Sequence, residues 1–133
     1  MGVEKQKTIL AIDDNATQLK IFEKFLSSRY ELALVKSASE AIGLLRTRNF
    51  DLILLDIEMP DVSGFEFLHE IRKIPQCMSK PVIIVTSHSE PDIINHARHS
   101  SASGVLTKPV NSKQLSKAID LAFSGPAVDP FNL

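Results

Sequence analysis

Acidic, hydroxyl and amino side chains stand at the ends of four of the five short apolar runs in this sequence. In chain order they are Asp13, Asp14, Asp56, Thr86 and Lys108. Taken one at a time, each has an ordinary explanation, because Asp is common in turns and at helix ends and Lys is common in loops. Four runs that each end in a reactive residue type are better explained by one shared site, and this favours a functional interpretation.

The three aspartates of this set predict a site for a divalent cation. Two carboxylates at close range repel one another by about 4 kcal/mol at the effective dielectric of a protein surface, so three of them need a cation nearby. Oxygen ligands with room for water suit Mg²⁺, or Mn²⁺ in its place, whereas zinc prefers nitrogen and sulfur. We therefore expect Mg²⁺ to bind at Asp13, Asp14 and Asp56.

The charge balance of the set predicts a nucleophilic carboxylate. A divalent cation together with Lys108 balances the three negative charges, so that a phosphoryl group can approach. Without the cation and the lysine, a phosphate would face unscreened carboxylates. Asp56 follows the middle run, and we therefore predict that it is the carboxylate that accepts the phosphoryl group.

Five apolar runs separated by helix-patterned stretches indicate an α/β fold. The runs span residues 8–12, 30–35, 52–55, 82–85 and 104–107. Runs that are apolar on both faces, such as 52–55, are typical of central strands in a parallel sheet that is covered by helices on each side. Right-handed crossovers bring the carboxyl ends of such strands to one edge, where ligands bind. The polar residues that end the runs should therefore meet there.

Helix start signals lie between the runs. We expect a first helix over residues 16–27 and further helices that begin at Ser37, Ser63, Ser89 and Asn111. Ser37 and Ser63 are each followed three residues later by Glu, the capping-box pattern in which each partner satisfies a free backbone donor. Ser89 precedes Pro and Asp in a first turn, and Asn111 has Gln three residues later. These signals predict five helices.

Length, composition and charge limit what this sequence can do. It has 133 residues, 44% hydrophobic and 23% charged, which predicts one globular domain. A formal net charge of -1 leaves no basic excess for binding nucleic acid or an anionic membrane. The single cysteine, Cys77, excludes an internal disulfide and a multi-cysteine metal cage, and it is typical of a reducing cytoplasm. No apolar run approaches the roughly 20 residues of a membrane span.

These residues together resemble a known family. The sequence is similar to the receiver domain of two-component response regulators at Asp13-Asp14, Asp56-Ile57-Glu58-Met59-Pro60-Asp61-Val62-Ser63-Gly64, Thr86 and Lys108-Pro109. The resemblance covers about residues 7–124, so we expect residues 1–133 to form a single receiver domain with a tail or linker stub at 125–133. It implies a flavodoxin-like three-layer sandwich with five helices and a five-stranded parallel sheet of order 2-1-3-4-5.

The resemblance implies a phosphoryl donor and a metal site. Asp56 would accept a phosphoryl group from the phosphohistidine of a sensor histidine kinase or of a histidine phosphotransfer protein. Asp14, Asp56 and the backbone carbonyl of Glu58 would hold Mg²⁺. Asp13 would assist the metal through water. The chain would then switch between an inactive and an active arrangement on phosphorylation.

The resemblance also implies how the phosphoryl group is held and read. Thr86 would hydrogen-bond the new phosphoryl oxygens and Lys108 would form a charge-assisted bond to them. The bond between Lys108 and Pro109 is similar to the cis peptide of the family. The family often has Tyr or Phe three residues before the lysine, where this chain has Val105, so the usual aromatic readout cannot operate. The surface of the fourth and fifth helices could still respond or form a dimer.

Several histidines and one glutamate invite functional interpretations. Glu58 and His88 lie two residues past Asp56 and Thr86 and are expected to flank the path of hydrolytic water, with solvated loop residues as the alternative. His96 and His99, one helical turn apart, are interpreted as solvated helix residues because the sequence fixes no third metal ligand near them. His69 is interpreted in the same way.

The predicted function is a phosphoacceptor signalling module of a two-component phosphorelay. We expect a cytoplasmic regulatory protein rather than an enzyme, with chemistry only on its own Asp56 and with output through a downstream effector or a covalently linked output domain. A Mg²⁺-dependent aspartate-nucleophile phosphohydrolase is the alternative, disfavoured because Asp56 follows the third run and no residues remain for a cap domain. A flavodoxin-like nucleotide binder ranks last, because no glycine-rich phosphate loop follows the first run.

Overall fold

The computed structural model describes residues 6–124, which alternate between strands and helices. In chain order the elements are β1 (Thr8–Ile12), α1 (Ala16–Leu26), β2 (Glu31–Val35), α2 (Ala38–Thr47), β3 (Leu52–Leu55), α3 (Gly64–Ile71), the 3₁₀ turn η1 (Pro75–Cys77), β4 (Val82–Thr86), α4 (Pro91–Arg98), β5 (Gly104–Thr107) and α5 (Ser112–Phe123). The predicted runs are confirmed as strands to within one residue at each end. The predicted tail at 125–133 lies outside the described residues.

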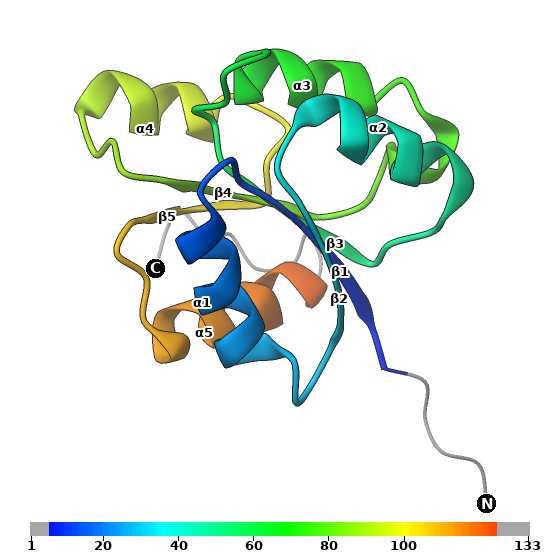
Figure 1. Ribbon diagram of the computed structural model, residues 1–133. Helices are drawn as coiled ribbons and strands as arrows, with labels where there is room; N and C mark the ends of the chain where they lie inside the picture. The colour runs from blue at the N-terminus through cyan, green and yellow to red at the C-terminus, as the bar shows by residue number, and fades with distance from the viewer. Residues whose placement is uncertain (1–5, 125–133) are drawn as a thin grey trace, which may run out of the picture.

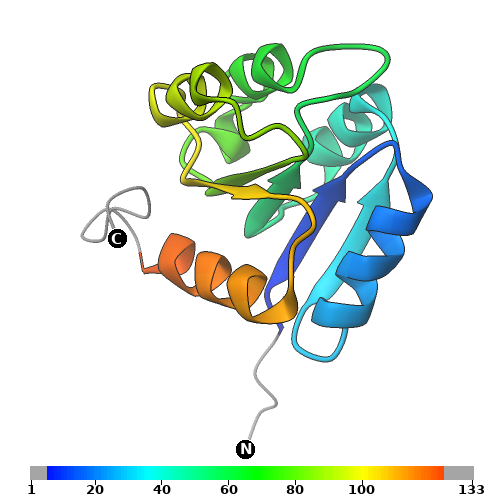
Figure 2. The same ribbon diagram turned by 90° about the vertical axis from the view of Figure 1, so that its left-hand side faces the viewer.

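The strands form one parallel sheet between two layers of helices. Its order is β2-β1-β3-β4-β5, and every neighbouring pair is parallel. Helices α1 and α5 lie on one face, while α2, α3 and α4 lie on the other (Figure 1). Figure 2 shows the strand arrows running in one direction, so that the loops after β1, β3, β4 and β5 gather at one edge. The predicted flavodoxin-like three-layer sandwich is confirmed.

Both faces of the sheet are apolar because each face covers a separate core. Successive side chains of a strand point to opposite faces. Ile9 of β1 therefore joins a buried cluster with Phe22 of α1 and Leu115 of α5, while its neighbour Leu10 joins another with Leu45 of α2. All five residues of β1 and of β4 are buried. No helix within residues 6–124 is long and apolar enough to cross a bilayer.

Three of the four predicted helix caps are found, and one is wrong. Ser37 Oγ accepts a hydrogen bond from the Glu40 backbone amide, and Ser63 and Asn111 likewise cap α3 and α5. The Ser63 hydroxyl accepts a hydrogen bond from the Phe65 backbone amide, whereas a capping box would use the amide of the next residue, Glu66. Ser89 does not cap α4. Pro91 occupies the first helical position and sets where that helix begins. Glu90 therefore stands at the cap position, and its side chain makes no capping hydrogen bond.

Gly64 begins α3 against the backbone of the segment that follows β3. Its amide donates to the Ile57 carbonyl at 3.0 Å. A methyl group at this position would collide with the Ile57 backbone and would lie 2.9 Å from the Asp56 carbonyl oxygen. Only glycine lets α3 start this close to the end of β3. The glycine therefore fixes the loop that carries Asp56 relative to the helix.

Gly64→Ala is expected to lower the free energy of unfolding by about 1–3 kcal/mol, because the extra methyl group forces the two backbones apart. Urea denaturation measures this. Gly43→Ala, inside α2, is the matched control, since a methyl group there meets nothing within 4 Å. It should raise stability by about 0.5–1 kcal/mol through helix propensity. Equal stabilities for the two variants would contradict the close approach at Gly64.

Candidate functional site

Three aspartates meet where β1 and β3 end side by side. Ile12 pairs with Leu55 in the parallel register, and the Asp56 amide donates to the Ile12 carbonyl at 3.0 Å. The residues that follow these strand ends, Asp13, Asp14 and Asp56, each place one carboxylate oxygen within 4.8 Å of the others. Within residues 6–124 no other group of three or more acidic, histidine or cysteine side chains comes together in this way.

Lys108 from the loop after β5 reaches the same place. Its Nζ lies 2.8 Å from Asp13 Oδ2 and 3.5 Å from Asp56 Oδ2. Its own amide donates to the Thr86 carbonyl at 2.7 Å, which ties the loop to β4. The Lys108–Pro109 peptide bond is cis, as predicted. Burial lowers the pKa of Lys108, but its hydrogen bonds and charge interactions with the two aspartates outweigh burial and raise the pKa above its ordinary value.

Asp56 is a buried carboxylate under electrostatic strain. Its residue is 4% exposed. Burial raises the pKa of Asp56 to about 6, and the charges of Asp13 and Asp14 act in the same direction. The Glu58 amide, which donates to Asp56 Oδ1 at 3.0 Å, and the charge of Lys108 oppose this rise in pKa. Added positive charge is therefore what this carboxylate needs in order to be a stable anion.

Asp13 and Asp14 are adjacent in sequence but differ in their surroundings. Asp13 is fully buried, and its Oδ1 accepts from the Asn15 amide at 2.9 Å while its Oδ2 faces Lys108. Asp14 is exposed. The donor set is therefore all oxygen, carries more negative than positive charge and is open to water on the Asp14 side. These properties fit Mg²⁺, which binds a few carboxylates and keeps several waters.

Thr86 is the last residue of β4 and is completely buried. Its Oγ1 accepts from the His88 amide at 3.0 Å. The neighbouring β5 contributes Val105, three residues before Lys108. Val105 is partly buried and packs against the small cluster of Ile57, Ile84 and Ala97. The space beneath α4 is thus filled by an aliphatic side chain.

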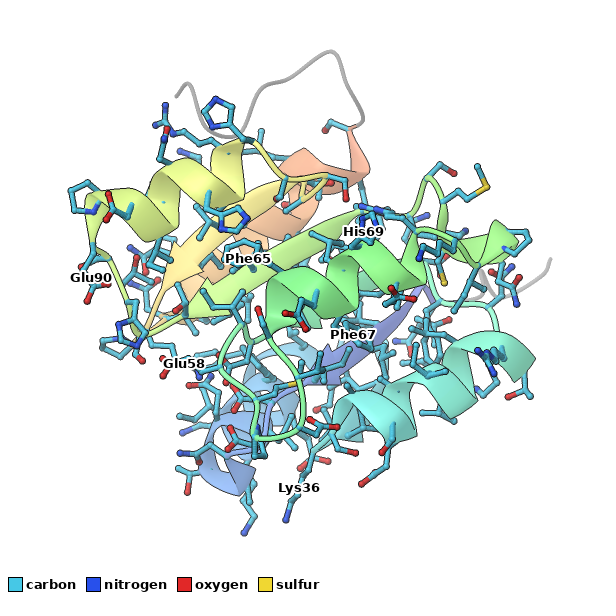
Figure 3. All side chains as sticks on the ribbon, turned by 90° about the horizontal axis from the view of Figure 1, so that it is seen from above. Lys36, Glu58, Phe65, Phe67, His69 and Glu90 are labelled. Carbon is cyan, nitrogen blue, oxygen red and sulfur yellow. The ribbon has the colours of Figure 1, made fainter. Side chains whose placement is uncertain are left out.

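An ionic bridge joins the loops after β3 and β4. His88 Nε2 lies 2.6 Å from Glu58 Oε1, and His88 Nδ1 lies 3.1 Å from Glu90 Oε1. Ser87 Oγ also donates to Glu58 at 3.2 Å. Figure 3 shows Glu58 and Glu90 on the same side of the molecule. Hydrogen bonds to Glu90 and to Glu58 raise the pKa of His88.

The sequence placed Glu58 and His88 near the site but did not reveal this bridge. The two residues are 30 positions apart along the chain, and no local pattern links them. A second unpredicted contact joins α3 to α4, where the rings of Phe65 and His96 stack with centroids 3.8 Å apart. Both contacts arise only because the sheet places the two loops and the two helices side by side.

Comparisons with known proteins show what this chain is similar to. Residues 9–120 match the family described as the response regulator receiver domain. The sequence is 36% identical over 110 residues to the two-component response regulator ARR12 of Arabidopsis thaliana, covering 80% of this chain and 18% of that protein. It is 30% identical over 118 residues to the two-component response regulator ORR6 of Oryza sativa, covering 86% of this chain and 69% of that protein.

A solved structure has a similar fold. The chemotaxis response regulator CheY4 of Vibrio cholerae superposes with a TM-score of 0.81 at 27% identity, covering 87% of this chain and 98% of that one. This chain therefore spans nearly the whole of CheY4, but less than a fifth of the length of ARR12. The chain thus matches more than two thirds of ORR6 but only a small part of ARR12.

Adding MgCl₂ is expected to raise the midpoint of thermal unfolding relative to KCl at the same ionic strength, because the cation binds the carboxylates that only the folded chain brings together. A ligand at a free concentration of 100 times its Kd raises the free energy of unfolding by about 2.7 kcal/mol. Asp14→Asn should lose most of this shift. Asp61→Asn, which changes an exposed aspartate of the nearby loop, should keep it. Equal shifts in all three proteins would place the metal elsewhere.

Proposed function

This chain belongs to the response regulator receiver domain family, and on that premise we propose that Asp56 is its phosphoacceptor. The observation that carries the proposal is the position of the Asp56 carboxylate. It is buried at the centre of the carboxyl edge of the sheet, beside two further aspartates and 3.5 Å from the Lys108 ammonium group. A nucleophile for phosphoryl transfer needs this combination of negative charge, a cation partner and restricted water.

The metal ligands in this proposal are Asp14, Asp56 and the backbone carbonyl of Glu58, with Asp13 assisting through water. Mg²⁺, or Mn²⁺ in its place, neutralises carboxylates and phosphoryl oxygens together when it is bound. The burial of Asp13 and its 2.8 Å contact with Lys108 support its indirect role, because its Oδ2 is already occupied by a cation. The exposure of Asp14 supports a direct role for that carboxylate.

The transfer step conserves atoms and charge in a simple way. An Asp56 carboxylate oxygen attacks the phosphorus of a phosphohistidine, the phosphorus–nitrogen bond breaks and the imidazole leaves with the electron pair of that bond. The product on this chain is an acyl phosphate. Lys108 then turns from the Asp56 carboxylate to the phosphoryl oxygens, where it forms a charge-assisted hydrogen bond. Its 3.5 Å distance from Asp56 Oδ2 supports this small movement.

Thr86 connects the phosphoryl group to the rest of the domain. Its hydroxyl oxygen now accepts from the His88 amide, and its proton is free to be donated to a phosphoryl oxygen. Movement of Thr86 toward Asp56 would release the His88 amide and shift the loop that leads into α4. Val105 then transmits the change by packing beneath α4 instead of by rotation of an aromatic ring.

The partners in this proposal follow from the reaction. A sensor histidine kinase or a histidine phosphotransfer protein supplies the phosphoryl group. A downstream effector or a covalently linked output domain reads the response, and the surface of α4 and α5 is the candidate for dimerisation. The proposed location is the cytoplasm. The domain acts as a regulator without substrate turnover, and the comparisons give no support to the phosphohydrolase alternative.

Incubation with acetyl phosphate and Mg²⁺ is expected to add one phosphoryl group to the wild-type chain and none to Asp56→Asn, because the amide is not a nucleophile for this step. Intact-mass spectrometry measures the addition. Asp61→Asn is the matched control and should be modified like wild type. A wild-type mass that never changes, with or without a phosphohistidine donor, would overturn the proposal. Hydrolysis of a phosphomonoester beyond one equivalent would revive the phosphohydrolase.

A further inference from the structure

A groove of about 430 Å³ runs between α3 and α4, away from the Asp56 site. Its polar lining is basic or neutral: His69, Arg72, His96, His99, Ser100 and Ser101. Phe65 and Leu68 supply apolar contact, and no carboxylate lines it. Phe65 and His69 follow one another along the side of α3 toward α4 (Figure 3). The lining of this groove therefore offers hydrogen-bond donors and no carboxylate, while Glu66 and Glu70 line the adjoining groove that shares Phe65, His69 and His96 with it.

Arg72 is the cation of this groove, and all its partners are neutral. Its Nε donates to Ser101 Oγ at 2.9 Å and its Nη2 to the Ser101 carbonyl at 2.8 Å. Its Nη1 donates to the carbonyls of Cys77 and Lys80 at 2.7 and 2.6 Å. These bonds hold the end of α3 to the segment before β4 and to the loop before β5.

The positive charge of Arg72 is not neutralised by the described part of the chain. None of the ion pairs between residues 6–124 includes it. Burial lowers the pKa of the Arg72 guanidinium, as expected for a cation that is partly removed from water without a carboxylate beside it. Charged groups that are removed from water are ordinarily paired. Lys108, by contrast, already lies against two carboxylates.

Donors remain around this charge after the internal bonds are counted. A guanidinium has five N–H groups, and four are used, which leaves one on Nη2. Ser101 Oγ accepts from Arg72, so its own proton stays available. The His99 Nδ1 lies 2.8 Å from the Asn95 carbonyl, which orients that ring. Arg72, His99 and Ser101 all line the groove.

We propose that the groove between α3 and α4 binds a phosphate-class oxyanion, with Arg72 as its counterion and the Ser101 hydroxyl as a second donor. A divalent metal is disfavoured because the guanidinium would repel it. An apolar ligand would leave the polar lining without partners. An oxyanion with several acceptor oxygens satisfies both the charge and the donors, and Arg binds such groups with a suitable planar geometry.

The proposed oxyanion site lies far from Asp56 and next to the ends of two helices. Ser101 precedes β5, whereas Asp56 follows β3, so the two sites lie at opposite edges of the parallel sheet. Ala97 is the only fully buried residue of α4. An anion held by Arg72, which directly follows α3, and by Ser101, which follows α4, would hold the C-terminal ends of the two helices together. The proposal stands whether or not Asp56 is phosphorylated.

Titration of the ¹⁵N-labelled chain with inorganic phosphate tests the site. In Mg²⁺-free buffer, with KCl matching the ionic strength, we expect saturable shifts of the Arg72 Nε–H signal and of the Ser100 and Ser101 amides. Arg46→Gln is the control, because Arg46 lines a separate groove beside α2 and should leave the titration unchanged. Shifts that do not saturate, or that are confined to Thr86 and Lys108, would overturn the proposal.

A pair of substitutions at Ser101 tests the missing counterion directly. Ser101→Asp supplies a carboxylate beside Arg72, while Ser101→Asn has nearly the same size and no charge. We expect a higher Tm for Ser101→Asp than for Ser101→Asn, and a phosphate affinity at least roughly tenfold weaker in Ser101→Asp than in Ser101→Asn, because both variants lack the hydroxyl and only one adds a negative charge. A negative charge near the C-terminal end of α4 is otherwise unfavourable, so a higher Tm for Ser101→Asp would indicate that the new carboxylate interacts with Arg72. A Tm no higher than that of Ser101→Asn would overturn the proposal.

Discussion

Repulsion between carboxylates at the end of the sheet is the constraint on which the rest of this structure depends. Asp13 and Asp56 are both buried, and their oxygens lie close to those of Asp14. A single ammonium group, Lys108, lies between the two buried aspartates. One positive charge does not balance three negative ones, and the pKa of Asp56 is raised first by burial and then by the charges of Asp13 and Asp14. The site therefore remains open to further positive charge, and this is what prepares it for a divalent cation and a phosphoryl group.

The fold keeps the three aspartates at the ends of the strands, apart from the hydrophobic cores. Strands β1 and β3 are apolar on both faces because helices cover each side, and their charged residues appear only where the strands end. Gly64 lets α3 approach the backbone after β3, which holds the loop of Asp56 in place. Burial of two hydrophobic cores thus stabilises a fold in which the carboxylates at one edge of the sheet repel one another.

Helix α4 has fewer buried residues than the other helices. Its fully buried residue is Ala97, Ile93 packs against the cluster of Ile57, Ile84 and Ala97, and the ring of His96 stacks on that of Phe65. At one end the His88 bridge reaches Glu58, close to Asp56. At the other end Ser101 is held by Arg72. An element with few buried contacts is suited to respond when its end contacts change.

The sequence alone determined the alternation of strands and helices, the positions of the strands and the residues of the acidic site. It could do so because apolar periodicity is a local pattern, and because strands of a parallel sheet bring their carboxyl ends to one edge. It misplaced the cap of α4, because Pro91 occupies the first helical position and so puts Glu90, not Ser89, at the cap position. Only the tertiary structure decided the Glu58–His88 bridge, the Phe65–His96 stack and the unneutralised Arg72, because each depends on segments far apart in sequence that packing brings together.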